Sequence, residues 1–434
     1  MASRVTVTAR FLLDVGRDVL GTLRGRWRRF RQRAVDGDTT AAVGVDIYPF
    51  FERMTGVGWY EWNLLGALAR RDDGLLYNLY GRTFLAASDP PAPELPWGDR
   101  MRLRVHQLPP GFLLPERLTL GLLRTVAEPL LRILDGNDVL FAPNFFIHAD
   151  QAPYGRSTVA TVHDLAFKAL PHTVAPATLA ELRRHLPDTL FHADRLVAVS
   201  DATSRDLVEH LGVRARQVHT VHEGLDPIFE EAPSDPRPEG LPERYLLFVS
   251  TLEPRKNVVG LLKAFRLIAE WGYPGALVLA GRWGWRTEAI QSELEGSPVR
   301  ERIVLLDYVE RAQLPSLYRH ADALLLPSWL EGFGLPILEA MAVGVPVVTS
   351  GQSSMPEVAG PAGVYVDPAS PHGIASGVAS LLADPDLRVR LSEVGRRRAR
   401  SFSWDRAAGA TAEILRQSAG LPARDDDEYR VDRR

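Results

Sequence analysis

The chain has 434 residues, more than the roughly 250 to 300 at which one hydrophobic core usually stops growing, so we expect two domains. Its net charge of −3 excludes a surface built throughout for nucleic acid. The chain has no cysteine, which excludes disulfides, thiolate metal sites and a cysteine nucleophile. This composition fits a reducing cytoplasm.

Two features of the sequence bear on membranes. No run reaches the roughly 18 consecutive apolar residues that a bilayer-spanning helix needs. The N-terminal run FLLDV is interrupted by Asp14, and no cleavage site of a secretory signal follows it. We therefore expect a cytoplasmic protein, peripheral at the inner face of the cell membrane if its N-terminal segment binds lipid.

Residues 1–40 form a basic N-terminal extension, with nine arginines and two aspartates up to Ala34. Apolar side chains recur there at spacings of three and four, as on one face of an amphipathic helix. Residues 10–34 are therefore a candidate contact with an anionic membrane surface. A solvated extension weakened by glycines, or a start codon assigned too far upstream, are the alternatives. The predicted apolar face comprises Leu12, Val15, Val19, Leu23, Trp27 and Phe30, and Arg17, Arg24, Arg28 and Arg31 fall largely on other faces.

From Ala42 onward, short β-branched runs alternate with helical stretches, which is typical of parallel sheets covered by helices on both faces. A stretch rich in proline and acidic residues, 229–243, predicts an interdomain linker. We expect two Rossmann-like α/β domains, 41–228 and 244–402, with a ligand cleft at the carboxyl ends of their strands. The charged tail, 421–434, is predicted to be solvated.

The segment Glu331 to Glu339, EGFGLPILE, is a glycine-containing turn that leads into an apolar helix. The free N–H groups near Gly334 and Leu335, together with the helix dipole, favour an anion such as a diphosphate. Glu339, in the first turns of that helix, is expected to bind ribose hydroxyls, and Glu331 to face a sugar. The alternative is a helix start with two incidental acidic residues.

A second motif, VSTLEPRKN, places two adjacent cations, Arg255 and Lys256, after a predicted strand and before Asn257, a candidate N-cap. Both cations can pair with phosphate oxygens, although a solvated surface pair is an equal alternative. In TVHDL, His163 ends a predicted strand, where it can contact a sugar hydroxyl, transfer a proton or be purely structural.

Gly56 and Gly58 belong to a glycine loop that opens a predicted helix after the first strand. Two glycines fall short of the GxGxxG dinucleotide fingerprint, so this loop is only weak evidence for a close approach of the backbone to a ligand.

At these residues the sequence resembles glycosyltransferase family 4, retaining enzymes of the GT-B fold, from about Ala42 to Gln417. Glu331 and Glu339 reproduce the family's pattern of two glutamates separated by seven residues. The resemblance implies that Lys256 binds the donor diphosphate and His163 the donor sugar. Gly56 and Gly58 match the family's glycine loop near the phosphates. It also implies two Rossmann-like domains facing across a cleft, with a C-terminal helix, 403–420, returning to the N-terminal domain.

The sequence departs from the family pattern at two places. Thr251 stands where the family usually has an arginine, and Arg255 is the candidate replacement for its charge. HEGLD, residues 222–226, replaces a commoner asparagine-glycine-valine-aspartate. TVHDL, TLEPRKN and GRWGW look most like the bacterial polysaccharide branch, in which mannosyl transfer from GDP-mannose is frequent.

The resemblance implies transfer of a hexose, with retention, to a hydroxyl of a glycan or lipid-linked glycan in cell-envelope polysaccharide synthesis. The donor would be GDP-mannose or a UDP-sugar, with no metal and no other cofactor, because cations and a helix N-terminus neutralise the leaving diphosphate. Nucleic acid is not an expected partner. A nucleotide-sugar epimerase or phosphorylase of the same fold, or an inactive scaffold, are the alternatives.

Overall fold

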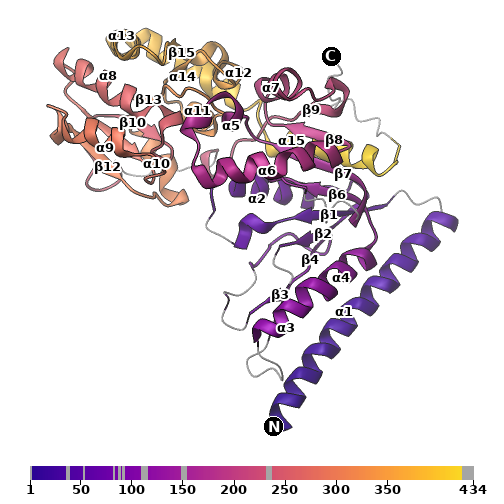
Figure 1. Cartoon of the computed structure of the whole chain (residues 1–434). Coiled ribbons are helices and arrows are strands. Elements are labelled where there is room, and N and C mark those ends of the chain that lie inside the picture. Colours follow the sequence, from indigo (N-terminus) through magenta and orange to yellow (C-terminus); the bar gives the residue numbers. More distant parts are fainter. Residues whose placement is uncertain are drawn as a thin grey trace.

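The computed structural model contains two parallel α/β sheets joined into one elongated molecule (Figure 1). It describes residues 2–35, 40–51, 54–81, 84–86, 89, 93–108, 116–147, 154–230 and 237–422. Part of the predicted linker and most of the charged tail lie outside these ranges, so those two predictions are not addressed by the structure.

The first sheet has seven strands in the order β4-β2-β1-β6-β7-β8-β9, and every pair is parallel. Its central strands are buried over most of their length, which explains why their sequences do not alternate between apolar and polar residues. The strands are β1 (Ala41–Asp46), β2 (Leu75–Tyr80), β4 (Met101–Leu103), β6 (Asn137–Ala142), β7 (Gly155–Val162), β8 (Arg195–Ala198) and β9 (Val218–Thr220). A separate parallel pair is formed by β3 (Phe84–Leu85) and β5 (His106–Gln107).

The helices of this half are connections between parallel strands, as the alternating pattern predicts. Ser200 caps α7 by accepting from the backbone N–H of Thr203 at 3.0 Å. The helices are α2 (Gly56–Ala69), α3 (Glu116–Leu122), a π-helical turn (Leu123–Ala127), α4 (Glu128–Asp135), α5 (Ala166–Ala169), α6 (Pro176–His192) and α7 (Asp201–Leu211).

The second sheet has six parallel strands in the order β12-β11-β10-β13-β14-β15. The strands are β10 (Tyr245–Val249), β11 (Ala276–Ala280), β12 (Ile303–Leu306), β13 (Ala323–Leu326), β14 (Val347–Ser350) and β15 (Gly363–Val366). The helices are α8 (Val258–Glu270), α9 (Glu288–Glu295), α10 (Leu314–Arg319), α11 (Leu335–Ala342), α12 (Met355–Ala359), α13 (Pro371–Ala383) and α14 (Pro385–Ala399).

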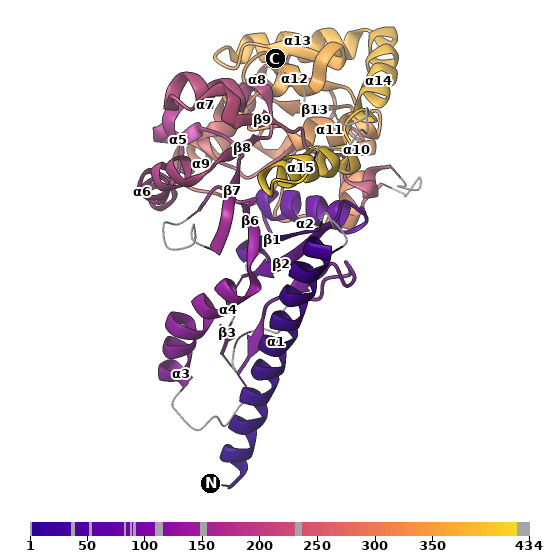
Figure 2. The same ribbon diagram turned by 90° about the vertical axis from the view of Figure 1, so that its right-hand side faces the viewer.

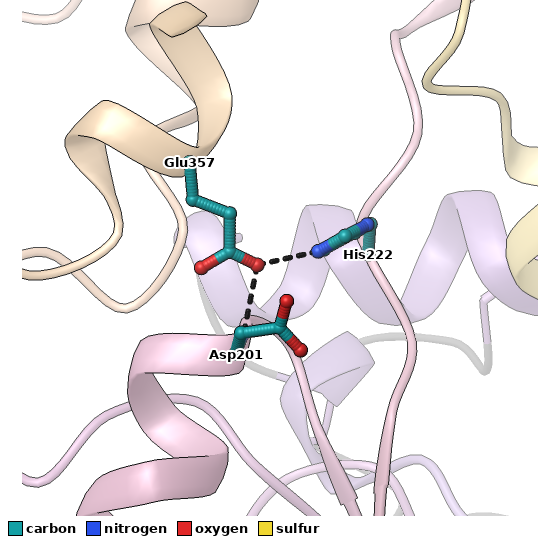
Figure 3. A group of neighbouring side chains, drawn as sticks. All are labelled: Asp201, His222 and Glu357. Atoms are coloured by element: carbon teal, nitrogen blue, oxygen red, sulfur yellow. Dashed lines mark hydrogen bonds and ion pairs between the residues drawn. The ribbon is translucent and has the colours of Figure 1, made fainter. Parts of the chain in front are cut away.

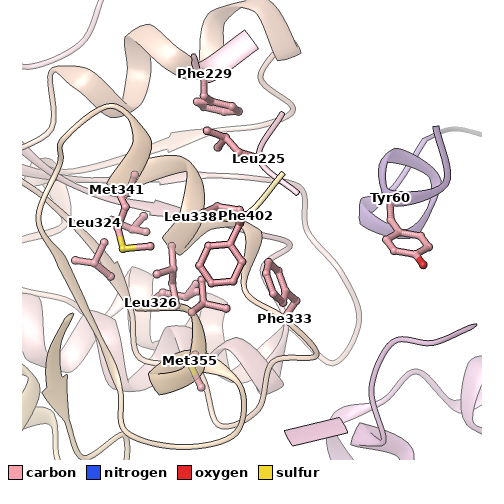
Figure 4. Close-up of a cluster of buried hydrophobic side chains, with 14 of the residues drawn as sticks. Tyr60, Leu225, Phe229, Leu324, Leu326, Phe333, Leu338, Met341, Met355 and Phe402 are labelled. Atoms are coloured by element: carbon pink, nitrogen blue, oxygen red, sulfur yellow. The ribbon is translucent and has the colours of Figure 1, made fainter. Parts of the chain in front are cut away.

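The last helix, α15 (Trp404–Ser418), returns to the first half of the chain and packs against α2. Trp404 lies edge-on to Tyr60 of α2, with ring centroids 5.7 Å apart. Just before α15, Phe402 packs on Phe333 near the start of α11, within the apolar cluster of Figure 4. The predicted GT-B architecture with a returning C-terminal helix is therefore confirmed.

The N-terminal segment forms the predicted helix, α1 (Ala2–Val35), but the helix is docked on the first domain. Phe11 is buried, and Val15 and Val19 pack with it on an apolar cluster that includes Phe84 and Leu131. The predicted apolar face is therefore partly wrong, because two of its six residues turn toward the protein. The side chains of Arg28, Phe30 and Arg31 lie outside the described part of the helix.

Candidate active site

A cavity of about 370 Å³ lies between the two sheets, within the range of sizes that small-ligand sites have. It receives residues from the ends of β1, β7 and β9 in the first half and of β10, β12 and β13 in the second, as expected for facing Rossmann-like domains. Eight of the nine predicted site residues line it, namely Gly56, His163, Arg255, Lys256, Glu331, Gly334, Leu335 and Glu339.

The ninth residue, Gly58, is not among the residues that line this cavity. Gly56 and Gly58 lie in the first turn of α2 rather than in a loop before it. A Cβ atom at Gly58 would lie 2.9 Å from the sulfur of Met54, whereas a Cβ at Gly56 would meet nothing within 4 Å. Gly56 therefore leaves open space at the cavity wall, and Gly58 allows close packing behind it.

Glu331 is held in one orientation by both its side chain and its backbone. Its carboxylate accepts hydrogen bonds from Nζ of Lys256 at 2.6 Å and from the hydroxyl of Ser328 at 2.7 Å. The hydroxyls of Ser353 and Ser354 donate to its backbone carbonyl. Burial by itself would raise the pKa of Glu331, but Lys256 and Arg255 outweigh it and hold this pKa below its usual value. The carboxylate is thus ionised and fixed at the cavity wall.

Arg255 and Lys256 lie in a short 3₁₀ turn directly after β10, so both stand at the carboxyl edge of the second sheet. Arg255 contacts Glu331 at 3.5 Å and Glu253 at 2.9 Å, and it reaches Asp164 of the first domain at 3.7 Å. Burial disfavours its charge, but these carboxylates prevail and raise its pKa. Both cations line the cavity and are pre-positioned by carboxylates, which fits them to receive an anionic ligand.

Asn257 follows these cations and is the N-cap residue of α8, as predicted, but its side chain makes no capping bond. It adopts a left-handed conformation with φ of 57° and donates to the carbonyls of Pro327 and Pro368. The amide thus ties the 3₁₀ turn to the loops that follow β13 and β15.

The helix α11 begins directly after Gly334, whose φ of +111° is accessible to glycine at little cost. In the first turn Pro336 has no N–H, and the N–H of Ile337 donates to the carbonyl of Gly334 at 2.9 Å. The N–H groups near Gly334 and Leu335, together with the helix dipole, make this end attractive to anions. Glu339 faces the cavity one turn later and accepts from the hydroxyl of Tyr318 at 2.6 Å. Burial raises the pKa of Glu339, although Tyr318 and Arg311 oppose the shift.

His163 follows β7 and is 7% exposed. Its Nε2 lies 2.8 Å from the carbonyl of Pro143, which can only accept, so Nε2 carries a proton and Nδ1 is left for the cavity side. The ring also stands perpendicular to Tyr60 of α2 at a centroid distance of 4.7 Å. The histidine is therefore held in place, and its Nδ1 lies near Glu223 beside the cavity.

Several cavity residues were not singled out from the sequence. Glu223, from the HEGLD segment, is 5% exposed, and its carboxylate lies 3.9 Å from Nδ1 of His163. Arg311, which follows β12, stacks on Trp59 at 3.7 Å and pairs with Asp226 of the first domain. Burial lowers the pKa of Arg311 to about 10. The unusual HEGLD sequence was the available signal for Glu223, whereas nothing in the local sequence pairs Arg311 with Trp59.

Gly332 brings the two domains into direct contact beside the cavity. A Cβ atom at this position would lie 2.0 Å from the backbone carbonyl oxygen of His163. The hydroxyl of Thr203 in the first domain also lies 3.4 Å from the carbonyl of Gly332. The glycine is therefore required for close approach between the domains, and its φ is not in the left-handed range.

A second contact between the domains involves Glu357 of α12 (Figure 3). Its carboxylate accepts from the backbone N–H groups of Asp201 and Ala202, at the N-terminus of α7, and lies 2.5 Å from Nε2 of His222. Asp201, His222 and Glu357 could geometrically approach a metal ion. The oxygens of Glu357 are already engaged by a helix N-terminus, however, so the geometry favours an anion-to-helix contact that joins the domains.

We predict that Glu357→Gln weakens this contact by about 1 to 2 kcal/mol, because a neutral amide loses the charge-assisted bonds. Small-angle scattering should show a more open molecule, and Glu288→Gln, at an exposed position of α9, should leave it unchanged. The bonds from His222 and α7 outweigh burial and lower the pKa of Glu357. The stabilisation that the Glu357 contact provides is therefore complete above the ordinary pKa of a glutamate. It is lost as the pH falls through the lowered pKa of Glu357. Identical scattering for both variants would contradict this role.

The arrangement of the two sheets matches solved structures. An Anabaena protein, Alr3699/HepE, solved with UDP-glucose, superposes with a TM-score of 0.64 at 18% identity, over 87% of this chain and 100% of that one. Two parallel sheets with a cavity between them therefore have the GT-B fold.

The sequence comparisons identify the family. The model for Glycosyltransferase Family 4 matches residues 54–229, and that for Glycosyl transferases group 1 matches residues 231–398. The O-antigen chain mannosyltransferase B of Escherichia coli is 29% identical over 375 residues, which are 82% of this chain and 95% of that protein. An MMP alpha-(1->4)-mannosyltransferase of Mycolicibacterium hassiacum is 32% identical over 51% of this chain and 54% of that protein. The chain belongs to glycosyltransferase family 4 and is a glycosyltransferase.

Proposed function

We propose that this enzyme transfers a hexose, with retention, from a nucleotide-sugar to a hydroxyl of a glycan or lipid-linked glycan during synthesis of a cell-envelope polysaccharide. The observation that carries the proposal is the cluster in which Lys256 and Arg255 contact Glu331 beside the N-terminus of α11. It provides cations and N–H groups for a diphosphate and a fixed carboxylate for the sugar next to it.

The proposed roles follow from the positions around the cavity. The donor diphosphate lies at Gly334 and Leu335, where Lys256 and Arg255 neutralise its charge and Gly56 leaves space on the opposite wall. Glu339 binds the ribose hydroxyls. His163 and Glu331 bind and orient the sugar, and Gly58 supports the wall near the phosphates.

In the proposed reaction, the acceptor oxygen forms a bond to the anomeric carbon on the face from which the diphosphate departs. The acceptor proton passes to the departing phosphate oxygen, so the products are the glycoside and a nucleoside diphosphate. Glu331 stabilises the positive charge that develops on the sugar, and the cations stabilise the leaving group. Domain closure excludes water from this step.

GDP-mannose is the proposed donor, with a UDP-sugar as the second candidate. Two relatives named as mannosyltransferases, one of them an O-antigen enzyme, support mannose and a polysaccharide acceptor. The solved Anabaena protein was bound to UDP-glucose, which supports a UDP-sugar as the second candidate donor.

We place the enzyme in the cytoplasm, peripheral at the inner face of the cell membrane through α1. Among the described residues, no helix carries an apolar stretch that could cross a bilayer. Contact with a lipid-linked acceptor would therefore occur at the membrane surface.

A thermal-shift screen of GDP-, UDP- and ADP-sugars tests the donor. A ligand at 100 times its Kd should stabilise the folded enzyme by about 2.7 kcal/mol, and we expect the largest shift with GDP-mannose. Incubating the best donor with acceptor, without acceptor and with inorganic phosphate then separates transfer from epimerisation and phosphorolysis. If none of the donors shifts the melting temperature, the proposed site is wrong.

A further inference from the structure

One face of α1 packs against the N-terminal domain. Besides the apolar contacts of Phe11, Val15 and Val19, Asp18 pairs with Arg102 and lies 2.6 Å from Arg104, next to β4. Burial would raise the pKa of Asp18, but His106 and the two arginines lower it, so the carboxylate stays charged. The helix is therefore fixed along one side of the N-terminal domain (Figure 2).

The opposite face of α1 is apolar and exposed. Trp27 is 60% exposed and Leu13 is 62% exposed, although both are large hydrophobic side chains. At 100° per residue, the exposed set falls on one side of the helix, away from Phe11 and Asp18. It comprises Leu12, Leu13, Leu20, Leu23 and Trp27.

A second apolar stripe lies on the continuous helical segment that runs from α3 through the π-helical turn to α4. Its residues recur at spacings of four, four, four and three, and each is more than half exposed. They are Leu118, Leu122, Val126, Leu130 and Ile133. Because α4 packs against α1, the two stripes belong to the same end of the N-terminal domain, away from the second sheet (Figures 1 and 2).

The concentration of these side chains is unusual. Among the described residues, 17 large hydrophobic side chains are exposed, and these ten account for more than half of them. Scattered exposed apolar residues are normal, but their concentration on two helices at one end of a domain indicates an interaction surface. The positions on α3 and α4 lie outside the segment that the sequence pattern marked as amphipathic.

Arginines beside the apolar stripe of α1 indicate what kind of partner this surface binds. Arg10, Arg17 and Arg24 are exposed and follow one another at intervals of seven residues, so they form a line along one edge of the apolar face of α1. A row of arginines beside leucines and a tryptophan matches anionic headgroups over acyl chains.

We propose that these ten apolar residues and three arginines form one lipid-docking surface, which seats this end of the N-terminal domain on an anionic bilayer. The proposal deepens the membrane-face location given above, and it does not depend on the identity of the donor. Contacts from two helices hold the domain in a set orientation on the bilayer, so that the cleft meets a lipid-linked acceptor at a constant height.

The test is co-sedimentation of the full chain with phosphatidylcholine vesicles that contain or lack phosphatidylglycerol. We expect binding to anionic vesicles to weaken at least about tenfold in Leu122→Glu/Val126→Glu, in Leu20→Glu/Trp27→Glu and in Arg17→Glu/Arg24→Glu. Phe191→Glu on α6, at a position 84% exposed, and Val389→Glu on α14 are matched controls and should bind as the wild type does.

Each of these variants should transfer sugar to a soluble acceptor at the rate of the wild type. A failure of membrane docking can therefore be distinguished from a failure of the proposed reaction. The Leu122→Glu/Val126→Glu pair keeps the test valid if changes in α1 disturb its docking. Wild-type binding of that pair to anionic vesicles would overturn the role of the second stripe. If light scattering instead shows a dimer that the same substitutions dissociate, the surface binds a second copy and the proposal is wrong.

Discussion

Glu331→Gln is expected to lower the rate of sugar transfer by about 100- to 1000-fold while leaving nucleoside diphosphate binding intact or stronger. The amide keeps the shape of the side chain but not the charge that stabilises the reacting sugar. At the same time Lys256 loses its buried anionic partner and Arg255 loses one of its three carboxylate contacts, so both become freer to bind a diphosphate. Turnover assays and calorimetric titration with the nucleoside diphosphate measure the two effects separately.

Glu253→Gln is the matched control for this variant. Glu253 is 2% exposed and also contacts Arg255, but it is not among the residues that line the cavity. Its replacement should cost stability through the same arginine without a comparable loss of transfer. Equal losses of transfer in the two variants would mean that Glu331 acts only by holding Arg255, and near-normal turnover of Glu331→Gln would remove it from the reaction.

Gly332→Ala is expected to reduce transfer at least about 100-fold by preventing close approach of the domains. The added methyl group would lie 2.0 Å from a backbone oxygen of the first domain, and backbone cannot rotate away as a flexible side chain can. Nucleotide binding should persist, because Lys256, Arg255 and the N-terminus of α11 all belong to the second domain.

Turnover, nucleotide titration and small-angle scattering test this expectation. Gly351→Ala serves as the control, since a Cβ there would make only ordinary contact, 4.0 Å from Tyr365. A Gly332→Ala enzyme with wild-type kcat/KM would show that the contact between Gly332 and His163 is not needed during catalysis.

The fold could be predicted because its physical causes are local. Many of the buried parallel strands are short runs of apolar or β-branched residues, as in Tyr245–Val249. Most are followed by a helix, such as α8, that returns the chain so that the next strand can be parallel. The position of the cleft follows from that topology, and the motif spacing identified eight residues that line it.

What could not be predicted depends on contacts between distant segments. The periodicity of α1 marks it as amphipathic, but Leu12 and Val15 are both apolar, and only the docking partners decide which one faces the protein. Arg311 stacks on Trp59, a residue 252 positions earlier, and the requirement for glycine at position 332 comes from a carbonyl of the other domain. Such pairings are set by the packing of whole domains.

The most direct test of the central claim is the anomeric configuration of the product, observed by NMR while the enzyme acts on GDP-α-mannose and an acceptor. The proposed site predicts an α-mannoside that appears together with GDP and only when acceptor is present. A β-linked product, or release of mannose 1-phosphate or an epimerised donor in place of a glycoside, would contradict it.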